Sequence, residues 1–388
     1  MKKALVLLLI LAVAGGAFAQ GLTLTGDIFS GVNLAIVDVD GVNPSFGLAN
    51  AEGNMVMMNL TGRWVNEDDT AGVRFQIRGQ RNTSINNNDV FLNDPFRIQW
   101  AYAWVRAMDG MLTLYGGKLD QSGFATGGGV DHHLQMHGST GLRLDIAAMD
   151  TLTLGLGVFS NQRFDSFTER SELGNVKFNF HFNFLVPDTI RVIGGFTTVN
   201  DYHGWDAVDG KYKSMKGVIG FQILALRSAG FNSLILDAEF GRLNDFSDNG
   251  YVTVGQRVVY GGIEDVELGL RAVQRIPMHD NEDLGMSFYV WGVYSGLGNI
   301  IPRLDFGFDM GTGFRSVHMN GPRQVWDSLN RGGMNSDNMN MVIRPSVQLR
   351  VANNQAVDIG YSGQIDMSSP TPSHSMVHNI FIFHRVSF

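Results

Sequence analysis

The feature that most constrains the fold of this chain is an alternation of apolar and polar residues with a period of two. From Val176 to Phe184, every even position is apolar and every odd position is polar. Successive side chains of a β-strand point to opposite faces, so this pattern predicts a two-sided strand. A helix would scatter the same apolar residues around its circumference, and the pattern therefore excludes a helix here. Residues 71–80 and 303–310 repeat the scheme, and 97–104 places Ile98, Trp100, Tyr102 and Trp104 on one face.

About eighteen segments carry this alternation, which predicts an all-β chain. They lie near residues 22–37, 54–65, 70–80, 97–107, 111–119, 139–147, 151–159, 173–185, 189–199, 214–226, 232–241, 250–260, 264–274, 285–296, 300–310, 340–350, 355–362 and 378–388. Most are about 9–11 residues long, the length that a tilted strand needs to cross a bilayer.

The connections between these segments alternate in length. Tight turns rich in Asp, Asn, Gly and Pro fall at 66–69, 108–110, 148–150, 186–188, 261–263 and 352–354. Longer connections fall at 38–53, 81–96, 120–138, 160–172, 200–213, 275–284, 311–339 and 363–377, whereas 242–249 is modest. Short turns on one side and long loops on the other are typical of outer-membrane barrels.

We therefore predict a single transmembrane antiparallel up-and-down β-barrel of about 18 strands, with 16 as the alternative, short periplasmic turns and long extracellular loops. An even strand number places both termini in the periplasm. A soluble β-sandwich or propeller would also alternate. Aromatic apolar faces, uniform strand lengths and the alternating loop lengths favour the membrane.

The first residues predict export. Lys2 and Lys3 precede the apolar run from Ala4 to Ala14, and Ala17-Phe18-Ala19 forms a small-x-small cleavage site. Residues 1–19 are therefore expected to be a cleaved signal peptide, leaving 20–388 as the barrel. No later apolar run is long enough for a membrane-spanning helix. The chain has no cysteine, which excludes disulfides and thiolate chemistry, and its net charge of −8 gives no general affinity for nucleic acid.

The last strand carries the residues of a family resemblance. Phe388 ends the chain after Val386, His384, Ile382 and Ile380 at even spacing. This pattern resembles that of bacterial outer-membrane porins, and the Gly- and Met-rich style is similar to that of spirochaete porins. The resemblance implies that Phe388, Val386 and Ile382 form the signal that the barrel-assembly machinery recognises. His384 departs from the apolar pattern, which predicts either a position at the membrane interface or a bulge that shifts the register.

The width of the barrel indicates its function. Eighteen strands about 4.8 Å apart and tilted by about 40° give a backbone radius of roughly 18 Å, which side chains cannot fill. We therefore expect an outer-membrane channel for passive diffusion of small hydrophilic solutes. The alternation predicts these pore-lining charges: Arg74, Arg78, Arg97, Arg143, Asp145, Lys177, Arg191, Asp237, Glu239, Glu267, Arg271, Arg303, Asp305, Asp309, Arg344 and Arg350. Cations outnumber anions among them, so a mild anion preference is one expectation. Mutual pairing of the charges, with no preference, is the other.

The aromatic side chains of the apolar faces are expected to contact lipid. These are Trp100, Tyr102, Trp104, Phe178, Phe180, Phe182, Phe184, Phe306 and Phe308. The alternative is an aromatic platform for sugars inside the pore, which needs rings on the inner face.

Other chemistry finds little support in the sequence. Asp131, His132, His133 and His137 could hold Zn²⁺ or Cu²⁺, but they follow a run of glycines in an expected loop, where solvated histidines are common. No Gly-x-Ser-x-Gly, His-Glu-x-x-His or P-loop pattern occurs, so we expect no enzyme and no cofactor. The competing function is a surface-exposed binding protein or adhesin whose pore is closed or incidental. Expected partners are outer-membrane lipids, the barrel-assembly machinery and small solutes, with a monomer and a homotrimer both open.

Overall fold

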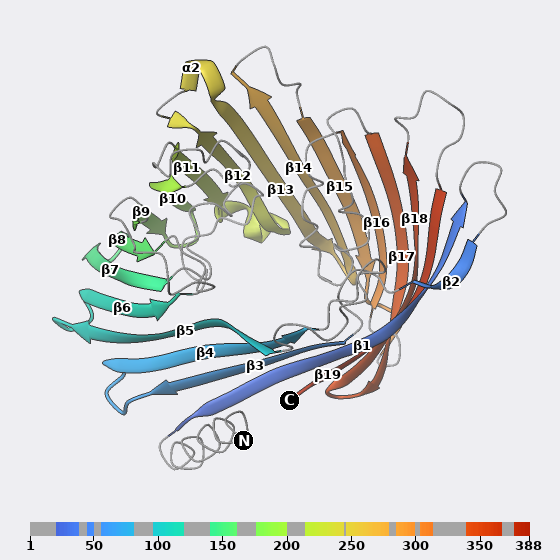
Figure 1. The fold of residues 1–388 in the computed structure, drawn as a ribbon, viewed down its shortest axis with the longest axis horizontal. Coiled ribbons are helices and arrows are strands. Elements are labelled where there is room, and N and C mark those ends of the chain that lie inside the picture. Colours follow the sequence, from blue (N-terminus) through green and yellow to red (C-terminus); the bar gives the residue numbers. More distant parts are fainter. Residues whose placement is uncertain are drawn as a thin grey trace, which may run out of the picture.

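The protein is a β-barrel built from one antiparallel sheet, as the computed structural model in Figure 1 shows. The structure describes residues 21–38, 45–49, 56–80, 96–119, 140–160, 176–199, 214–243, 246–278, 285–298, 303–312, 339–366 and 376–388. Within these ranges lie nineteen strands, a 3-10 helix η3 (Ala225–Ala229) and a four-residue helix α2 (Phe246–Asn249). No helix of the described residues is long and apolar enough to cross a membrane.

The strands follow one another around a common interior in sequence order (Figure 1). They are β1 (Thr23–Asp38), β2 (Ser45–Ala49), β3 (Val56–Val65), β4 (Ala71–Gln80), β5 (Phe96–Ala107), β6 (Leu112–Lys118), β7 (Thr140–Met149), β8 (Leu152–Ser160), β9 (Val176–Val186), β10 (Ile190–Val199), β11 (Ser214–Ile223), β12 (Phe231–Gly241), β13 (Tyr251–Ile263), β14 (Val266–Pro277), β15 (Gly285–Tyr294), β16 (Arg303–Thr312), β17 (Met339–Ala352), β18 (Gln355–Asp366) and β19 (Met376–Ser387).

The first strand joins the two ends of the chain. On one side of β1, Asp27–Asp38 pair with residues 376–387 of β19. On its other side, β2 pairs with residues 33–37 of β1, and β3 pairs with residues 23–30. Because β2 and β3 share one side of β1, the nineteen strands occupy eighteen positions (19 − 1) around the sheet. The prediction that the last strand pairs with the first is confirmed.

Each of the eighteen predicted segments overlaps a strand, and only β2 was missed. The turns on one side of the sheet are short, for example residues 150–151 between β7 and β8 and residues 353–354 between β17 and β18. In the β3–β4 turn, the side-chain oxygen of Asn66 accepts hydrogen bonds from the backbone N–H groups of Thr70 and Ala71, each at 2.8 Å. Such Asn-centred turns reverse the chain without a long loop.

Candidate pore lining

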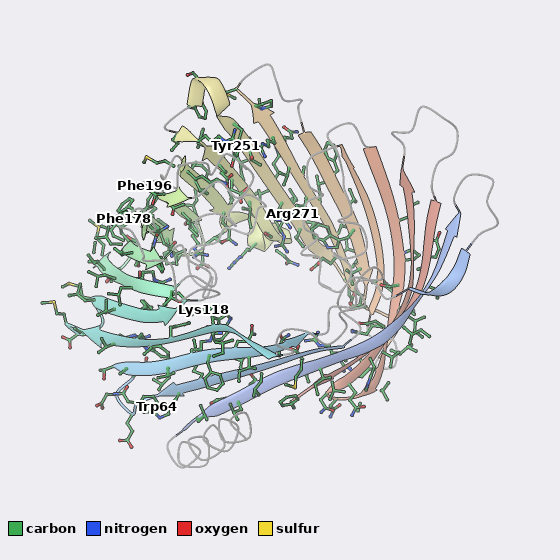
Figure 2. The ribbon with its side chains drawn as sticks, in the orientation of Figure 1. Trp64, Lys118, Phe178, Phe196, Tyr251 and Arg271 are labelled. Atoms are coloured by element: carbon green, nitrogen blue, oxygen red, sulfur yellow. The ribbon has the colours of Figure 1, made fainter. Side chains whose placement is uncertain are left out.

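Strand β9 has an exposed apolar face and a buried polar face. Phe178 and Phe184 are 53% and 36% exposed, whereas Asn179 and His181 between them are only 4% and 3% exposed. In a barrel that spans a membrane, the exposed apolar face contacts lipid and the other face looks inward. Phe178 and Phe196 lie on the outer side of the wall and Arg271 on the side toward the interior (Figure 2).

Two groups of charged side chains gather on this inward face. The first, here called the β7–β9 cluster, consists of Arg143, Asp145, Asn179 and His181. Arg143 Nε and His181 Nε2 lie 3.1 and 3.5 Å from Asp145 Oδ1. The Nδ1 atom of His181 lies 2.5 Å from the side-chain oxygen of Asn179. The guanidinium of Arg143 also stacks 4.2 Å above the ring of Tyr115. The polar groups of this face are thus joined to one another across three strands.

The second group, here called the β11–β14 cluster, consists of Lys216, Glu239, Tyr251 and Arg275. Tyr251 donates a hydrogen bond of 2.9 Å from its hydroxyl to Glu239 Oε1, and Lys216 Nζ lies 3.5 Å from the same oxygen. Arg275 stacks on the ring of Tyr251 with 3.9 Å between its Cζ and the ring centroid. Lys216 and Glu239 are both buried. A buried charge is tolerated where it is paired and hydrogen-bonded, as it is here.

The other predicted lining charges with described side chains are spread around the same face. Arg74 stacks on Trp100 at 4.8 Å. Arg191 donates to the side-chain oxygen of Asn183 at 3.0 Å, and Glu267 accepts a 3.3 Å hydrogen bond from Trp291. Asp237 and Arg271 are buried at 1% and 5% exposure, whereas Arg350 is exposed near the turn after β17. That these side chains line a pore stays a prediction.

Several predicted residues lie beyond what the structure describes. The side chains of Arg78, Arg97, Lys177, Arg303, Asp305, Asp309 and Arg344 are not described, although their strands are. The stretch from Asp131 to His137 and residues 313–338 of the longest loop lie outside the described residues altogether. Within the described ranges, no group of three or more His, Cys, Asp or Glu side chains could hold a metal ion.

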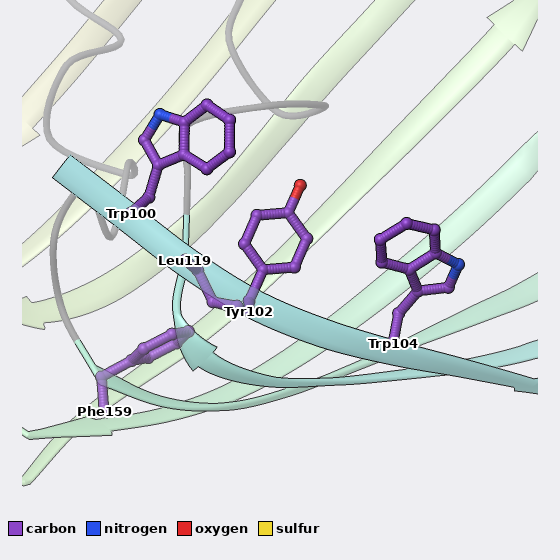
Figure 3. Packing of buried hydrophobic residues seen from close by; sticks show 5 residues of the cluster. All are labelled: Trp100, Tyr102, Trp104, Leu119 and Phe159. Atoms are coloured by element: carbon purple, nitrogen blue, oxygen red, sulfur yellow. The ribbon is translucent and has the colours of Figure 1, made fainter. Parts of the chain in front are cut away.

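The prediction that Trp100, Tyr102 and Trp104 contact lipid was wrong. The three side chains are only 7–8% exposed and project from the same side of β5, together with the buried Leu119 and Phe159 (Figure 3). The cause is a β-bulge. Gln76 pairs with Trp100 and the next residue, Ile77, pairs with Ile98, so the ladder skips Gln99. One extra residue flips every following side chain to the other face. Ile98 before the bulge is therefore 55% exposed.

The sequence prediction also omitted several inward residues. Asn179, His181, Lys216, Tyr251, Arg275 and Asp358 all lie on this face. The signal for Lys216 was present, because its neighbours at odd positions, Met215, Ile219 and Phe221, form the apolar face of β11. The signal for His181 was its odd position in the opening pattern of β9.

Phe388 packs against the first strand on the outer face. Its backbone N–H donates to Gly26 O at 2.9 Å, and the N–H of Gly26 donates to Phe388 O at 2.8 Å. A Cβ atom on Gly26 would overlap the ring of Phe388, so the ring lies directly over this glycine. An aromatic ring laid over a cross-strand glycine fills the space that the missing side chain leaves. Upstream, Ile382 is 46% exposed and Val386 half-buried.

Comparison with known proteins identifies the fold. Pseudomonas aeruginosa OpdQ superposes with a TM-score of 0.54 at 10% identity, covering 95% of this chain and 98% of that one. A BenF-like porin from Pseudomonas fluorescens Pf-5 superposes with a TM-score of 0.53 at 10% identity, covering 94% and 99%. The chain has the fold of a bacterial outer-membrane porin. P. aeruginosa OpdO gives 0.52 at 10% identity, covering 95% and 97%. No protein-family model and no curated protein sequence matches the chain.

Proposed function

We propose that this protein is an outer-membrane channel for the passive diffusion of small hydrophilic solutes. The observation that carries the proposal is a ring of eighteen strand positions in which the strands with described side chains have an exposed apolar outer face and charged, hydrogen-bonded side chains on the inner face. Barrels of 16–18 strands leave an aqueous channel that side chains do not fill. Outer-membrane porins with this fold are channels rather than enzymes, and on this proposal the charged clusters of the inner face belong to the channel wall.

The same proposal fixes the topology and the partners. Residues 1–19 are cleaved, and 20–388 insert as one barrel with both termini in the periplasm. Outer-membrane lipid contacts the apolar face, and the barrel-assembly machinery recognises Phe388, Val386 and Ile382. The position of Phe388 over Gly26 supports this role, because the pairing of the first and last strands leaves no open edge at that point.

A mild anion preference remains part of the proposal, and the paired clusters limit its size. Asp145 lies beside Arg143, and Glu239 beside Lys216, so these charges partly cancel. Ten cations stand against six anions among the predicted lining charges, which supports a small positive surplus. Reversal potentials across a planar bilayer with a salt gradient measure this directly, and a clear cation preference would refute it.

Liposome swelling tests the diffusion of uncharged solutes. Proteoliposomes that hold the purified protein should swell in sugars of increasing size at rates that fall steeply with solute mass. Vesicles prepared with heat-unfolded protein are the control. Equal swelling in both preparations would contradict the proposal.

A closed barrel with a surface role is the second candidate, and one observation favours it. Inward-facing Thr197 and Asp237 are 0% and 1% exposed, far less than an open, water-filled wall would leave them. On this alternative the protein is a surface-exposed binding protein or adhesin, and swelling stays at the control level for every solute.

A further inference from the structure

Asp145, Gly155 and His181 form one cross-strand row on the inward face. Asp145 pairs with Gly155 between β7 and β8, and Gly155 pairs with His181 between β8 and β9. Strands two positions apart are separated by about 10 Å. His181 Nε2 nevertheless lies 3.5 Å from Asp145 Oδ1. The two side chains therefore reach toward each other across the intervening strand.

Gly155 is what permits this contact. A Cβ atom at this position would overlap Nε2 and Cε1 of the His181 ring, so the imidazole lies directly over the glycine. On the far side of His181, the cross-strand partner is Gly195, which likewise has no side chain. Any larger residue at position 155 would push the imidazole away from Asp145.

Both nitrogens of the ring face oxygen atoms. Nδ1 lies 2.5 Å from Asn179 Oδ1, and Nε2 faces the carboxylate of Asp145. A neutral imidazole donates one hydrogen bond, whereas the imidazolium donates two. Among the residues with described side chains, the charged and titratable groups around the ring are Asp145 and Arg143 on β7, with Tyr115 of β6 stacked on Arg143. The site can thus take up one proton with an acceptor ready on each side.

We propose that His181 and Asp145 form a proton-binding site that makes the ion selectivity of this channel depend on pH. The inference rests on the proposed channel function. Imidazole changes its charge between pH 5 and 8, whereas carboxylates titrate mainly below that range. When the imidazole binds one proton, the inner wall gains one positive charge. Acidification therefore favours the passage of anions over cations.

Reversal potentials at pH 8 and pH 5.5 test the proposal in the full chain, in planar bilayers with a potassium chloride gradient of low ionic strength. The chloride-to-potassium permeability ratio of the wild type should rise by about twofold on acidification, because one unit charge near the path of the ions changes their relative permeability by a factor of about this size. His181→Gln should lose most of that rise. The matched control is His384→Gln, since His384 lies on the outward-facing side of β19, and it should retain the rise.

Gly155→Ala tests the geometry of the site without replacing either of its titratable residues. This variant keeps both titratable groups and displaces the imidazole, so the midpoint of the pH response should shift while its amplitude remains. Gly292→Ala is the control, because its added Cβ meets Leu268 at an ordinary 3.6 Å. If the pH response of Gly155→Ala has the same midpoint as that of the wild type, the position of the imidazole over Gly155 does not control proton binding. The proposed role of Asp145, Gly155 and His181 as one row would then be wrong.

A stability measurement distinguishes failure of this site from failure of the channel proposal. If the wild type conducts at no pH, the channel proposal fails, and urea unfolding in liposomes still reports proton uptake. The change in unfolding midpoint between pH 8 and 5.5 should then differ between the wild type and His181→Gln. The proton site is refuted if His181→Gln matches the wild type in the pH dependence of both selectivity and unfolding.

Discussion

Replacing Lys216 by methionine should destabilise the barrel strongly, because it leaves Glu239 as a buried carboxylate without its nearest cation. The two side chains are only 7% and 3% exposed, and Nζ lies 3.5 Å from Oε1. Methionine keeps most of the length of the lysine stem, so the packing changes little. The effect measured is therefore that of the charge.

The expected magnitude follows from burial. Removing one partner of a buried ion pair typically costs about 3–5 kcal/mol, since the remaining charge is desolvated and uncompensated. Glu239 keeps the 2.9 Å hydrogen bond from Tyr251, which places the expected loss near the lower end, at about 3 kcal/mol. Neutralising both groups in Lys216→Met with Glu239→Gln should recover most of this loss, to within about 1 kcal/mol of the wild type.

The assay is urea-induced unfolding in liposomes, followed by tryptophan fluorescence. Lys118→Met is the control, because Lys118 is more exposed than Lys216 and donates to the backbone carbonyl of Ile98 at 2.8 Å. It should cost about 1 kcal/mol. If the free energy of unfolding of Lys216→Met lies within about 0.5 kcal/mol of that of the wild type, the buried pair does not stabilise the barrel as argued. The same conclusion follows if the double variant is no more stable than Lys216→Met.

Three further changes test the wall and its seam by the same unfolding measurement. Phe388→Ala should lose about 1–2 kcal/mol, because the ring that covers Gly26 is removed while both backbone hydrogen bonds remain; unchanged stability would argue against the packing. Gly72→Val should cost about 2–3 kcal/mol and alter the fluorescence of Trp104, whose indole occupies the space of the new side chain; an unaltered spectrum would be the contrary result. Asn66→Ala should cost about 1–2 kcal/mol through loss of two accepted hydrogen bonds, and no change would show that water replaces them.

The strands could be predicted from sequence because a membrane barrel repeats one simple constraint. Each strand must present apolar side chains to lipid and polar ones to the interior, so the period of two persists through all eighteen predicted segments. The short strand β2 was missed because its five residues lie inside a long connection and, within the described part of the chain, pair with the far half of β1. Its existence depends on that partner rather than on its own pattern.

The inner wall could be predicted only in part. Alternation selected Arg143, Asp145 and Glu239, but not His181, Lys216 and Tyr251, which contact them from other strands. The contact between Asp145 and His181 depends on the register of two hairpins and on a glycine between them. The prediction of the face on which Trp100 lies was wrong, because the bulge at Gln99 does not interrupt the alternation of the residues that follow it.

The most direct test of the channel proposal is the single-channel conductance of the purified full-length protein in a planar lipid bilayer. A water-filled barrel of eighteen strand positions should give discrete, long-lived conductance steps that scale with salt concentration. Bilayers that hold the folded protein, as judged by its resistance to unfolding, but give no steps at any salt concentration would contradict the proposal.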